Sequence, residues 1–111
     1  MPIATCLMRE ASDMERDAAS LVGRWAELSG CEAGLLTVDM LPARRLSGES
    51  RRAMGTLHLP TMWPKDKAER IALGLVRALS EWMGTGPEEV HLMIRWVESG
   101  TVVEDGEILT W

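Results

Sequence analysis

The sequence predicts an α/β (α+β) fold of two tandem β-α-β units that form a four-stranded mixed sheet with two helices on one face. Two stretches of helical apolar periodicity are each preceded and followed by a strand-like run. Gly30 and Gly84, which we expect to end the helices as left-handed caps, lie 54 positions apart. Because 111 residues support one core, we expect a single domain, 1–111, with pseudo-repeats 1–54 and 55–111.

The first unit is expected to contain a strand over residues 3–8, a helix, and a second strand over residues 35–41. Ser12 and Glu15 have the spacing of a capping box, so we expect the helix to begin at Ser12. An apolar stripe then follows the helical period. Its members are Met14, Ala18, Leu21, Val22, Trp25 and Leu28.

The second unit repeats this order with strands over 55–62 and 89–97 and a helix between them. Asp66 and Glu69 repeat the capping spacing, and the apolar stripe contains Ala68, Ile71, Ala72, Leu75, Leu79 and Trp82. A shift of 54 residues places Ile3, Thr5 and Leu7 on Leu57, Leu59 and Thr61. In each unit the two strands should be parallel with a right-handed crossover. Asp105-Gly106 predicts a short C-terminal hairpin.

The sheet face opposite the helices is expected to be apolar and to need a cover. By strand alternation it would carry Ala4, Cys6, Met8, Thr37, His58, His91 and Met93. Sheets that contain parallel strands are normally covered on both faces. We therefore expect this face to contact another subunit, with the two histidines as interface residues.

Composition excludes several classes of partner. The net charge of −5 argues against binding to a nucleic-acid backbone. The apolar run 71–76 is too short to span a membrane, and no signal-peptide pattern is present, so we expect a cytoplasmic protein without membrane contact.

Cys6 and Cys31 match no metal-ligand spacing and are expected to be free thiols. We expect neither a metal nor a cofactor.

Pro2 is the residue that most directly suggests chemistry. Removal of Met1 would leave a secondary amine at the head of the first strand. An α-amino group titrates near about 7.7 to 8, and burial beside a cation lowers its pKa further. Such a group can move protons to and from carbon at neutral pH. If Met1 is retained, the same nitrogen is an amide and has no basicity.

The first dozen residues resemble the tautomerase superfamily, the group of 4-oxalocrotonate tautomerase and macrophage migration inhibitory factor. Pro2-Ile3-Ala4 followed by Arg9-Glu10-Ala11-Ser12-Asp13 is similar to the opening of 4-oxalocrotonate tautomerase. Cys6-x-Met8-Arg9 is similar to the arginine-bearing subunit of trans-3-chloroacrylic acid dehalogenase. The duplicated β-α-β pattern extends the resemblance over nearly the whole chain.

This resemblance implies a homotrimer with pockets between subunits, Pro2 as the general base or acid, and Arg9 as a ligand of a substrate carboxylate. Compared with the closest pattern, the segment between Arg9 and Ser12 is one residue shorter and lacks a second arginine. Thr37 stands where several relatives carry another arginine. The missing cation would then come from Arg44, Arg45, Arg51, Arg52 or Arg95, and the apolar wall from Trp96 or Trp111.

The expected activity is 1,3-keto-enol isomerisation of a small carboxylate-bearing compound. Alternative chemistries on the same fold are those of a hydratase, dehalogenase or decarboxylase, for which Asp39 and Glu98 are candidate water-activating carboxylates. The alternative from another class is a non-catalytic oligomeric binding protein that keeps an anion pocket at Arg9. The sequence does not choose among these substrates and reactions.

Overall fold

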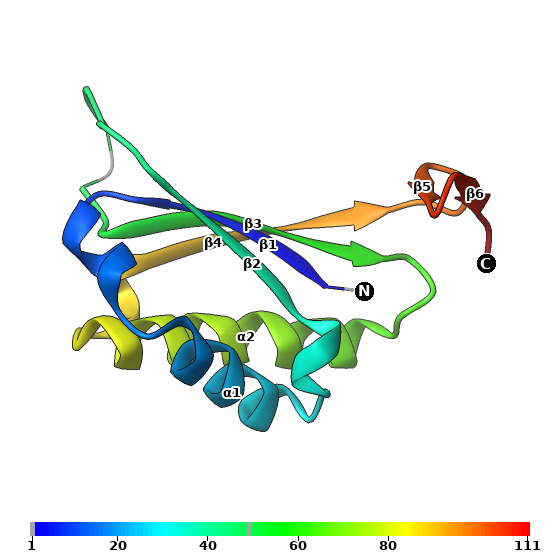
Figure 1. Cartoon of the computed structure of the whole chain (residues 1–111), viewed down its shortest axis with the longest axis horizontal. Helices are drawn as coiled ribbons and strands as arrows, with labels where there is room; N and C mark the ends of the chain where they lie inside the picture. Colours follow the sequence, from blue (N-terminus) through cyan, green and yellow to red (C-terminus); the bar gives the residue numbers. More distant parts are fainter. Residues whose placement is uncertain (1, 49) are drawn as a thin grey trace.

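A computed structural model describes residues 2–48 and 50–111 and confirms the predicted architecture (Figure 1). The four-stranded sheet has the order β2-β1-β3-β4. Its strands are β1 (Ile3–Met8), β2 (Thr37–Pro42), β3 (Ala53–Pro60) and β4 (Val90–Val97). Two helices, α1 (Ala18–Ser29) and α2 (Lys65–Met83), lie side by side on one face of the sheet.

The two halves of the sheet meet at an antiparallel pair. β1 runs parallel to β2, and β3 runs parallel to β4, whereas β1 and β3 are antiparallel. Three short 3-10 helices complete the units: η1 (Ala11–Glu15), η2 (Ala33–Leu35) and η3 (Pro87–Glu89). The start of β1 and the start of β3 therefore lie at opposite ends of the sheet.

The chain ends in a separate two-stranded hairpin, as predicted. It consists of β5 (Val102–Glu104) and β6 (Glu107–Leu109). Asp105 and Gly106 both have positive φ angles, 54° and 79°, which is the geometry of a tight two-residue turn. Figure 1 shows this hairpin projecting beyond the end of the main sheet. No helix in the described part of the chain is long and apolar enough to cross a membrane.

The predicted assignment of side chains to the two faces of β1 was wrong. Ala4, Cys6 and Met8 are buried beneath the helices with exposures of 0–1%, whereas Ile3 and Leu7 are about two-fifths exposed on the open face. The other predicted residues of the open face, Thr37, His58, His91 and Met93, do lie there. We use "open face" for the sheet face away from the helices.

This error has a geometric cause. The shift of 54 residues holds for the helix caps, Gly30 and Gly84, and for the second strands, where Thr37 corresponds to His91. However, Thr37 pairs with Ile3, and His91 pairs with Met54, so the first strands are related by a shift of 51. The difference of three residues is odd. Since side chains alternate along a strand, an odd slip exchanges the two faces.

Both predicted capping boxes were also wrong. Helix α1 begins at Ala18, where the Asp17 side chain accepts a 3.1 Å hydrogen bond from the Ala19 amide. Ser12 instead lies in η1, because the buried Asp13 side chain holds that segment in a separate turn. In the second unit, α2 begins at Lys65 after Pro64, so Asp66 lies inside the first helical turn.

The helices pack closely because a glycine stands at their contact. A Cβ atom at Gly74 of α2 would lie 2.9 Å from Ser29 Oγ and 3.3 Å from Leu28 Cβ of α1. Nearby, the indole N–H of the fully buried Trp25 donates a 2.9 Å hydrogen bond to the Ile71 carbonyl. This contact satisfies the polar atom of the largest side chain in the core.

We predict that Gly74→Ala destabilises the protein by about 1 to 3 kcal/mol, because the added methyl group overpacks the helix contact. Gly23→Ala on α1 is the matched control, since a Cβ there meets nothing within 4 Å. It should increase the free energy of unfolding by up to about 1 kcal/mol through helix propensity. Urea unfolding monitored by tryptophan fluorescence measures both. Equal effects of the two substitutions would contradict the close approach of the helices.

Candidate functional site

Pro2 is held at the head of β1 and is fully buried. Its carbonyl accepts a 3.1 Å hydrogen bond from the Thr37 amide at the start of β2. Extending the β1–β3 register by one residue places Pro2 opposite Leu59, which pairs with Trp96 on β4. The sheet therefore fixes the backbone and ring of Pro2. Trp96 lies two strands away from Pro2, on the other side of Leu59.

The neighbouring set of residues paired across the four strands lies on the open face and includes Arg95. Thr37, Ile3, His58 and Arg95 are successive neighbours across β2, β1, β3 and β4. The two strand spacings between Ile3 and Arg95 correspond to about 10 Å. Arg95 is exposed and forms no hydrogen bond or ion pair with the described residues. Its guanidinium is available to an anion at the Pro2 end of the sheet.

A groove beside Ile3 separates the C-terminal hairpin from the open face. It has a volume of about 150 Å³, and its lining is mostly apolar, with Ile3, Pro60, Met62, Val97, Leu109 and Trp111 among the contributors. The Trp111 indole N–H donates a 3.1 Å hydrogen bond to Thr61 Oγ1, which fixes the ring at the groove. Glu104 is the acidic residue of the lining. Neither Met62 nor Glu104 was singled out from the sequence.

Arg9 lies at the other end of β1. The intervening strand corresponds to about 23 Å, far beyond the reach of an arginine side chain. Its Nε donates to Glu10 at 3.3 Å, and its Nη1 donates to the Ser50 carbonyl. The structure therefore brings Pro2, Arg95, Trp96 and Trp111 to one end of a single chain, but it does not bring Arg9 there.

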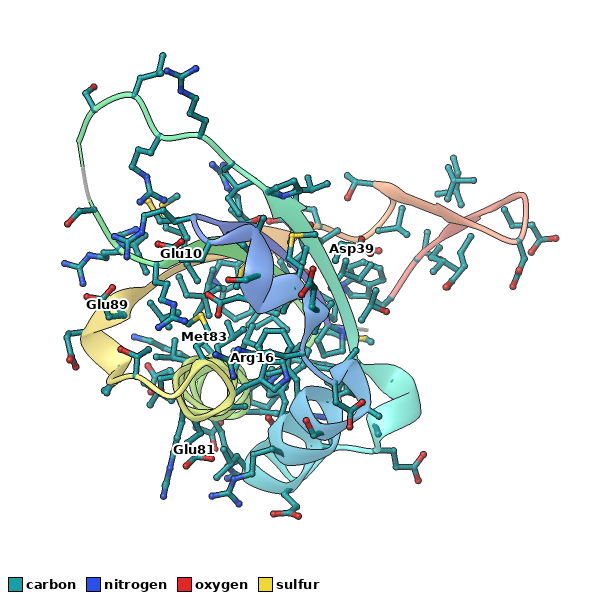
Figure 2. All side chains as sticks on the ribbon, turned by 60° about the vertical axis from the view of Figure 1, so that its left-hand side comes forward. Glu10, Arg16, Asp39, Glu81, Met83 and Glu89 are labelled. Carbon is teal, nitrogen blue, oxygen red and sulfur yellow. The ribbon has the colours of Figure 1, made fainter. Side chains whose placement is uncertain are left out.

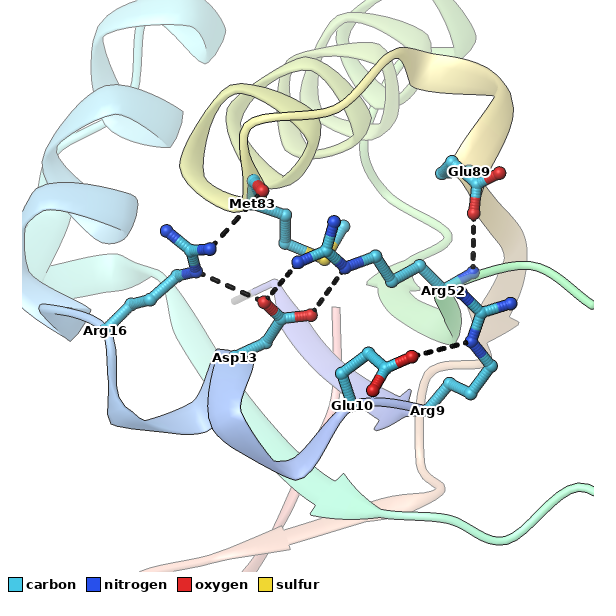
Figure 3. Close-up of polar contacts among 7 residues, drawn as sticks. All are labelled: Arg9, Glu10, Asp13, Arg16, Arg52, Met83 and Glu89. Atoms are coloured by element: carbon cyan, nitrogen blue, oxygen red, sulfur yellow. Dashed lines mark hydrogen bonds and ion pairs between the residues drawn. The ribbon is translucent and has the colours of Figure 1, made fainter.

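A buried carboxylate organises the Arg9 end of the molecule (Figure 3). Asp13 is only 1% exposed and accepts two hydrogen bonds from Arg52, at 2.7 and 2.8 Å. Arg16 donates a third at 3.2 Å. This cluster was not predicted, because Arg52 lies 39 residues from Asp13 in the sequence and only Arg16 is close to it.

The cluster has a clear electrostatic consequence. The Arg52 guanidinium, bound through two hydrogen bonds, lowers the pKa of Asp13, and Arg16 adds to this effect against the opposing influence of burial. The Arg52 amide also donates to Glu89 at 3.2 Å, while its carbonyl accepts from the Arg9 amide at 3.0 Å. Arg52 is therefore a structural residue that links β1, η1 and η3.

Of the other arginines in the connection between the two units, some donate hydrogen bonds to backbone carbonyls and one does not. Arg45 donates to the Arg51 carbonyl at 2.6 Å, and Arg51 donates to the Glu88 carbonyl at 2.7 Å. Arg44 is exposed and has no hydrogen-bond or ion-pair partner in the described part of the chain. Figure 2 shows this connection rising above the sheet on the side away from the helices.

The remaining candidate groups do not form a second chemical centre. Cys6 is buried, and this burial raises the pKa of its thiol to about 11, so the thiol stays protonated near neutral pH. Asp39 lies midway along the edge strand β2, beside Thr5 on the open face, whereas Glu98 follows the end of β4. Within the described ranges, no three His, Cys, Asp or Glu side chains come together in a metal-binding arrangement.

Comparison with solved structures gives full-length matches at low sequence identity. A wild-type fused 4-OT asymmetric trimer, R7, aligns with a TM-score of 0.76 and 9% identity over 96% of this chain and 94% of that chain. A protein inactivated by 2-oxo-3-pentynoate aligns with a TM-score of 0.73 and 13% identity over 96% and 94%. Macrophage migration inhibitory factor from Oncomelania hupensis aligns with a TM-score of 0.71 and 13% identity over 98% and 82%.

These matches identify the fold. It is the tautomerase-superfamily fold in its fused form, in which one chain carries two β-α-β units. Comparison of the sequence with family models and with curated proteins found no match. The chain thus combines this architecture with a sequence that is only 9–13% identical to the sequences of these three solved structures.

We predict that Asp13→Asn lowers the free energy of unfolding by about 3 kcal/mol, because it removes one partner of a buried ion pair. The exposed ion pair between Arg24 and Glu81 supplies the control, and Glu81→Gln should change stability little. Urea unfolding of both variants measures the difference. An equal, small effect of the two substitutions would contradict the structural role of Asp13.

The same carboxylate predicts an acid-dependent loss of stability. Because the pKa of Asp13 is lower in the folded state, its contribution is fully present above the unfolded pKa of about 3.9. The contribution is lost as the pH falls from there through the folded pKa. Unfolding free energies measured between neutral pH and strong acid should decrease more steeply for the wild type than for Asp13→Asn. Parallel curves would contradict this linkage.

Proposed function

We propose that the protein is a tautomerase that isomerises a small carboxylate-bearing keto-enol compound and uses the Pro2 nitrogen as its general base and acid. The observation that carries the proposal is the position of Pro2. Its ring is buried and its carbonyl is fixed by Thr37, while the adjoining groove at Ile3 is apolar and bordered by Trp111. An available arginine, Arg95, stands in the neighbouring row.

In this mechanism the neutral Pro2 amine removes a proton from the carbon next to the substrate carbonyl. The electrons of the C–H bond form the enolate, and the protonated amine then returns the proton to another carbon. The reaction moves one proton and needs no external oxidant or reductant. Burial of Pro2 favours the neutral form of the amine, since desolvation disfavours its ammonium form.

Arginine holds the substrate and stabilises the charge that develops on it. Arg95 of the same chain is proposed to bind the substrate carboxylate, and Arg9 of a neighbouring copy is proposed to complete the site in a homotrimer. A guanidinium binds a carboxylate through two parallel hydrogen bonds, which fixes the orientation of the substrate. The inactivation of a structurally similar protein by a 2-oxo acid supports a substrate of this class.

A non-catalytic carboxylate-binding protein is the second candidate. The exposed guanidinium of Arg95, which has no partner among the described residues, favours it, because binding of an anion there does not depend on the basicity of the Pro2 nitrogen. The two functions are distinguished by whether Met1 is removed or retained. Met1 lies outside the described residues. Retention of Met1 would leave the anion-binding groups in place but remove the basic amine.

We predict that protein lacking Met1 ketonises an arylpyruvate enol or 2-hydroxymuconate, whereas a form that retains Met1 does not. Retention of Met1 keeps the Pro2 ring and changes only the chemistry of its nitrogen. Pro2→Ala should lower kcat by about 10²- to 10⁴-fold, the usual contribution of a positioned base, with little change in KM. Enol absorbance gives the rates, and intact mass establishes the processing state. Equal activity of the processed and unprocessed forms would contradict the proposal.

We predict that Arg9→Ala and Arg95→Ala each weaken binding of a 2-oxo acid by about 1.5 to 3 kcal/mol, the value of a hydrogen bond to a charged group. Arg9→Lys should lose part of the affinity, because lysine cannot form the paired hydrogen bonds. Arg70→Ala, an exposed change on α2, is the control.

The same titrations with an uncharged ester of the ligand separate binding from structure. The ester should bind weakly and respond little to any of these substitutions. If acid and ester lose affinity equally in an arginine variant, that arginine supports the fold and does not hold the carboxylate.

A further inference from the structure

A groove on the helix side of the sheet lies apart from the site described above. It has a volume of about 210 Å³ and lies between η1, α1 and the edge strand β2, with a contribution from Trp82 of α2. We call it the α1–β2 groove. Neither Pro2 nor Arg95 belongs to its lining, so it is a cavity separate from the one at Ile3.

The groove exists because the helix layer does not fully cover the edge strand. Val38 and Met40 of β2 pair with Ala4 and Cys6 of β1 and share their face, which is the face that the helices cover. Ala4 and Cys6 are fully buried, whereas Val38 and Met40 are only half-buried. Ala18, the first residue of α1, brings a single methyl group to the groove and leaves space that a larger side chain would fill.

The lining is almost entirely apolar and has room for a small ring. The Trp82 indole N–H donates a 2.8 Å hydrogen bond to the Asp17 carbonyl, which fixes the ring and satisfies its polar atom. Met14 and Met40 are flexible side chains that adjust to the shape of an apolar body. Because a dry apolar cavity of about 150 Å³ is enough to bind benzene, the α1–β2 groove can hold a ring of this size and a short chain.

Arg16 is the charged residue of the lining, and it keeps donor capacity for an anion. Its Nε donates to Asp13 at 3.2 Å, and its Nη2 makes a long 3.5 Å contact with the Met83 carbonyl (Figure 3). Its Nη1 has no hydrogen-bond or ion-pair partner in the described part of the chain. Since Arg52 already binds Asp13 through two hydrogen bonds, the two guanidiniums exceed the one carboxylate by one positive charge.

We propose that the α1–β2 groove binds a small carboxylate with an apolar body, with the carboxylate on Arg16 and the body between α1 and β2. A guanidinium forms strong hydrogen bonds with a carboxylate, so charge selects an acid, and the volume limits its body to one ring or a short alkyl chain. None of the described residues that line the groove carries a hydroxyl, thiol, carboxylate or imidazole. The site therefore holds its ligand without converting it, and it does not depend on the proposed function.

The direct test is an NMR titration with phenylacetate and with its uncharged analogue phenylacetamide. The indole N–H signal of Trp82 reports binding in the groove and is assigned by its loss in Trp82→Phe. Phenylacetate should shift this signal with about tenfold higher affinity than phenylacetamide, the lower end of the value of a hydrogen bond to a charged group. Equal affinities of the acid and the amide, or an unshifted signal at about 10 mM phenylacetate, would overturn the inference.

A charge variant tests the role of Arg16. Arg16→Gln removes the positive charge and should weaken phenylacetate about tenfold while leaving phenylacetamide unchanged, so the variant no longer prefers the acid. Arg24→Gln is the matched control, because the Arg24 guanidinium on α1 is bound to Glu27 and Glu81. It should alter neither affinity. An Arg16→Gln protein that still prefers the acid would contradict the assignment of the carboxylate to this arginine.

A filled groove and an altered Pro2 end test the location. Val38→Phe places a ring in the α1–β2 groove and should abolish the Trp82 shift with both probes, whereas Arg95→Ala should leave it unchanged. Loss of the shift in Arg95→Ala together with its retention in Val38→Phe would place the ligand at the Pro2 end and refute the inference. A changed sedimentation mass of Val38→Phe would show that the groove is a contact between copies, which would also refute it.

Discussion

The pairing of β1 within the sheet is the constraint on which the rest of the structure depends. β1 is an inner strand, held by β2 on one side and by β3 on the other, and both partners fix its register from Ile3 to Met8. Pro2 and Arg9 are attached to its two ends, so the sheet holds them about 23 Å apart. A pocket that uses both residues must therefore be built from more than one copy of the chain.

The Arg9 end of the strand is positioned by a buried ion pair. Asp13 binds the side chain of Arg52, and the Arg52 backbone binds both Arg9 and Glu89. Figure 3 shows the contacts of Arg52 with Asp13 and Glu89. Removal of a buried charge partner is strongly destabilising, because the remaining charge is left without compensation. Asp13 therefore links the folding of η1 to the geometry of the end that presents Arg9. The Pro2 end is fixed instead by backbone hydrogen bonding to Thr37 and by apolar packing.

Local signals in the sequence predicted most of the fold but not its faces. Gly30 and Gly84 fixed the helix ends because a left-handed cap strongly favours glycine, and Asp105-Gly106 fixed the hairpin turn for the same reason. Ala4, Cys6 and Met8 were placed on the wrong face because a repeat offset taken from the helices does not hold for the strands. The candidate site residues Pro2, Arg95, Trp96 and Trp111 lie at one end of the sheet, and their roles stay predictions. The Asp13–Arg52 pair depends on a contact across 39 residues, which no local pattern reveals.

We propose that a functional site combines Pro2 of one copy with Arg9 of another. Pro2→Ala and Arg9→Ala chains, each expected to have low activity alone when substrate is limiting, can be unfolded together in equal amounts and refolded as mixed trimers. In a closed ring, a random mixture gives about a quarter of the sites an intact Pro2 and an intact Arg9 from neighbouring copies. Enol ketonisation by the mixture should therefore recover to about a quarter of the wild-type rate. A rate no greater than the mean of the two variants measured separately would contradict a site shared between copies.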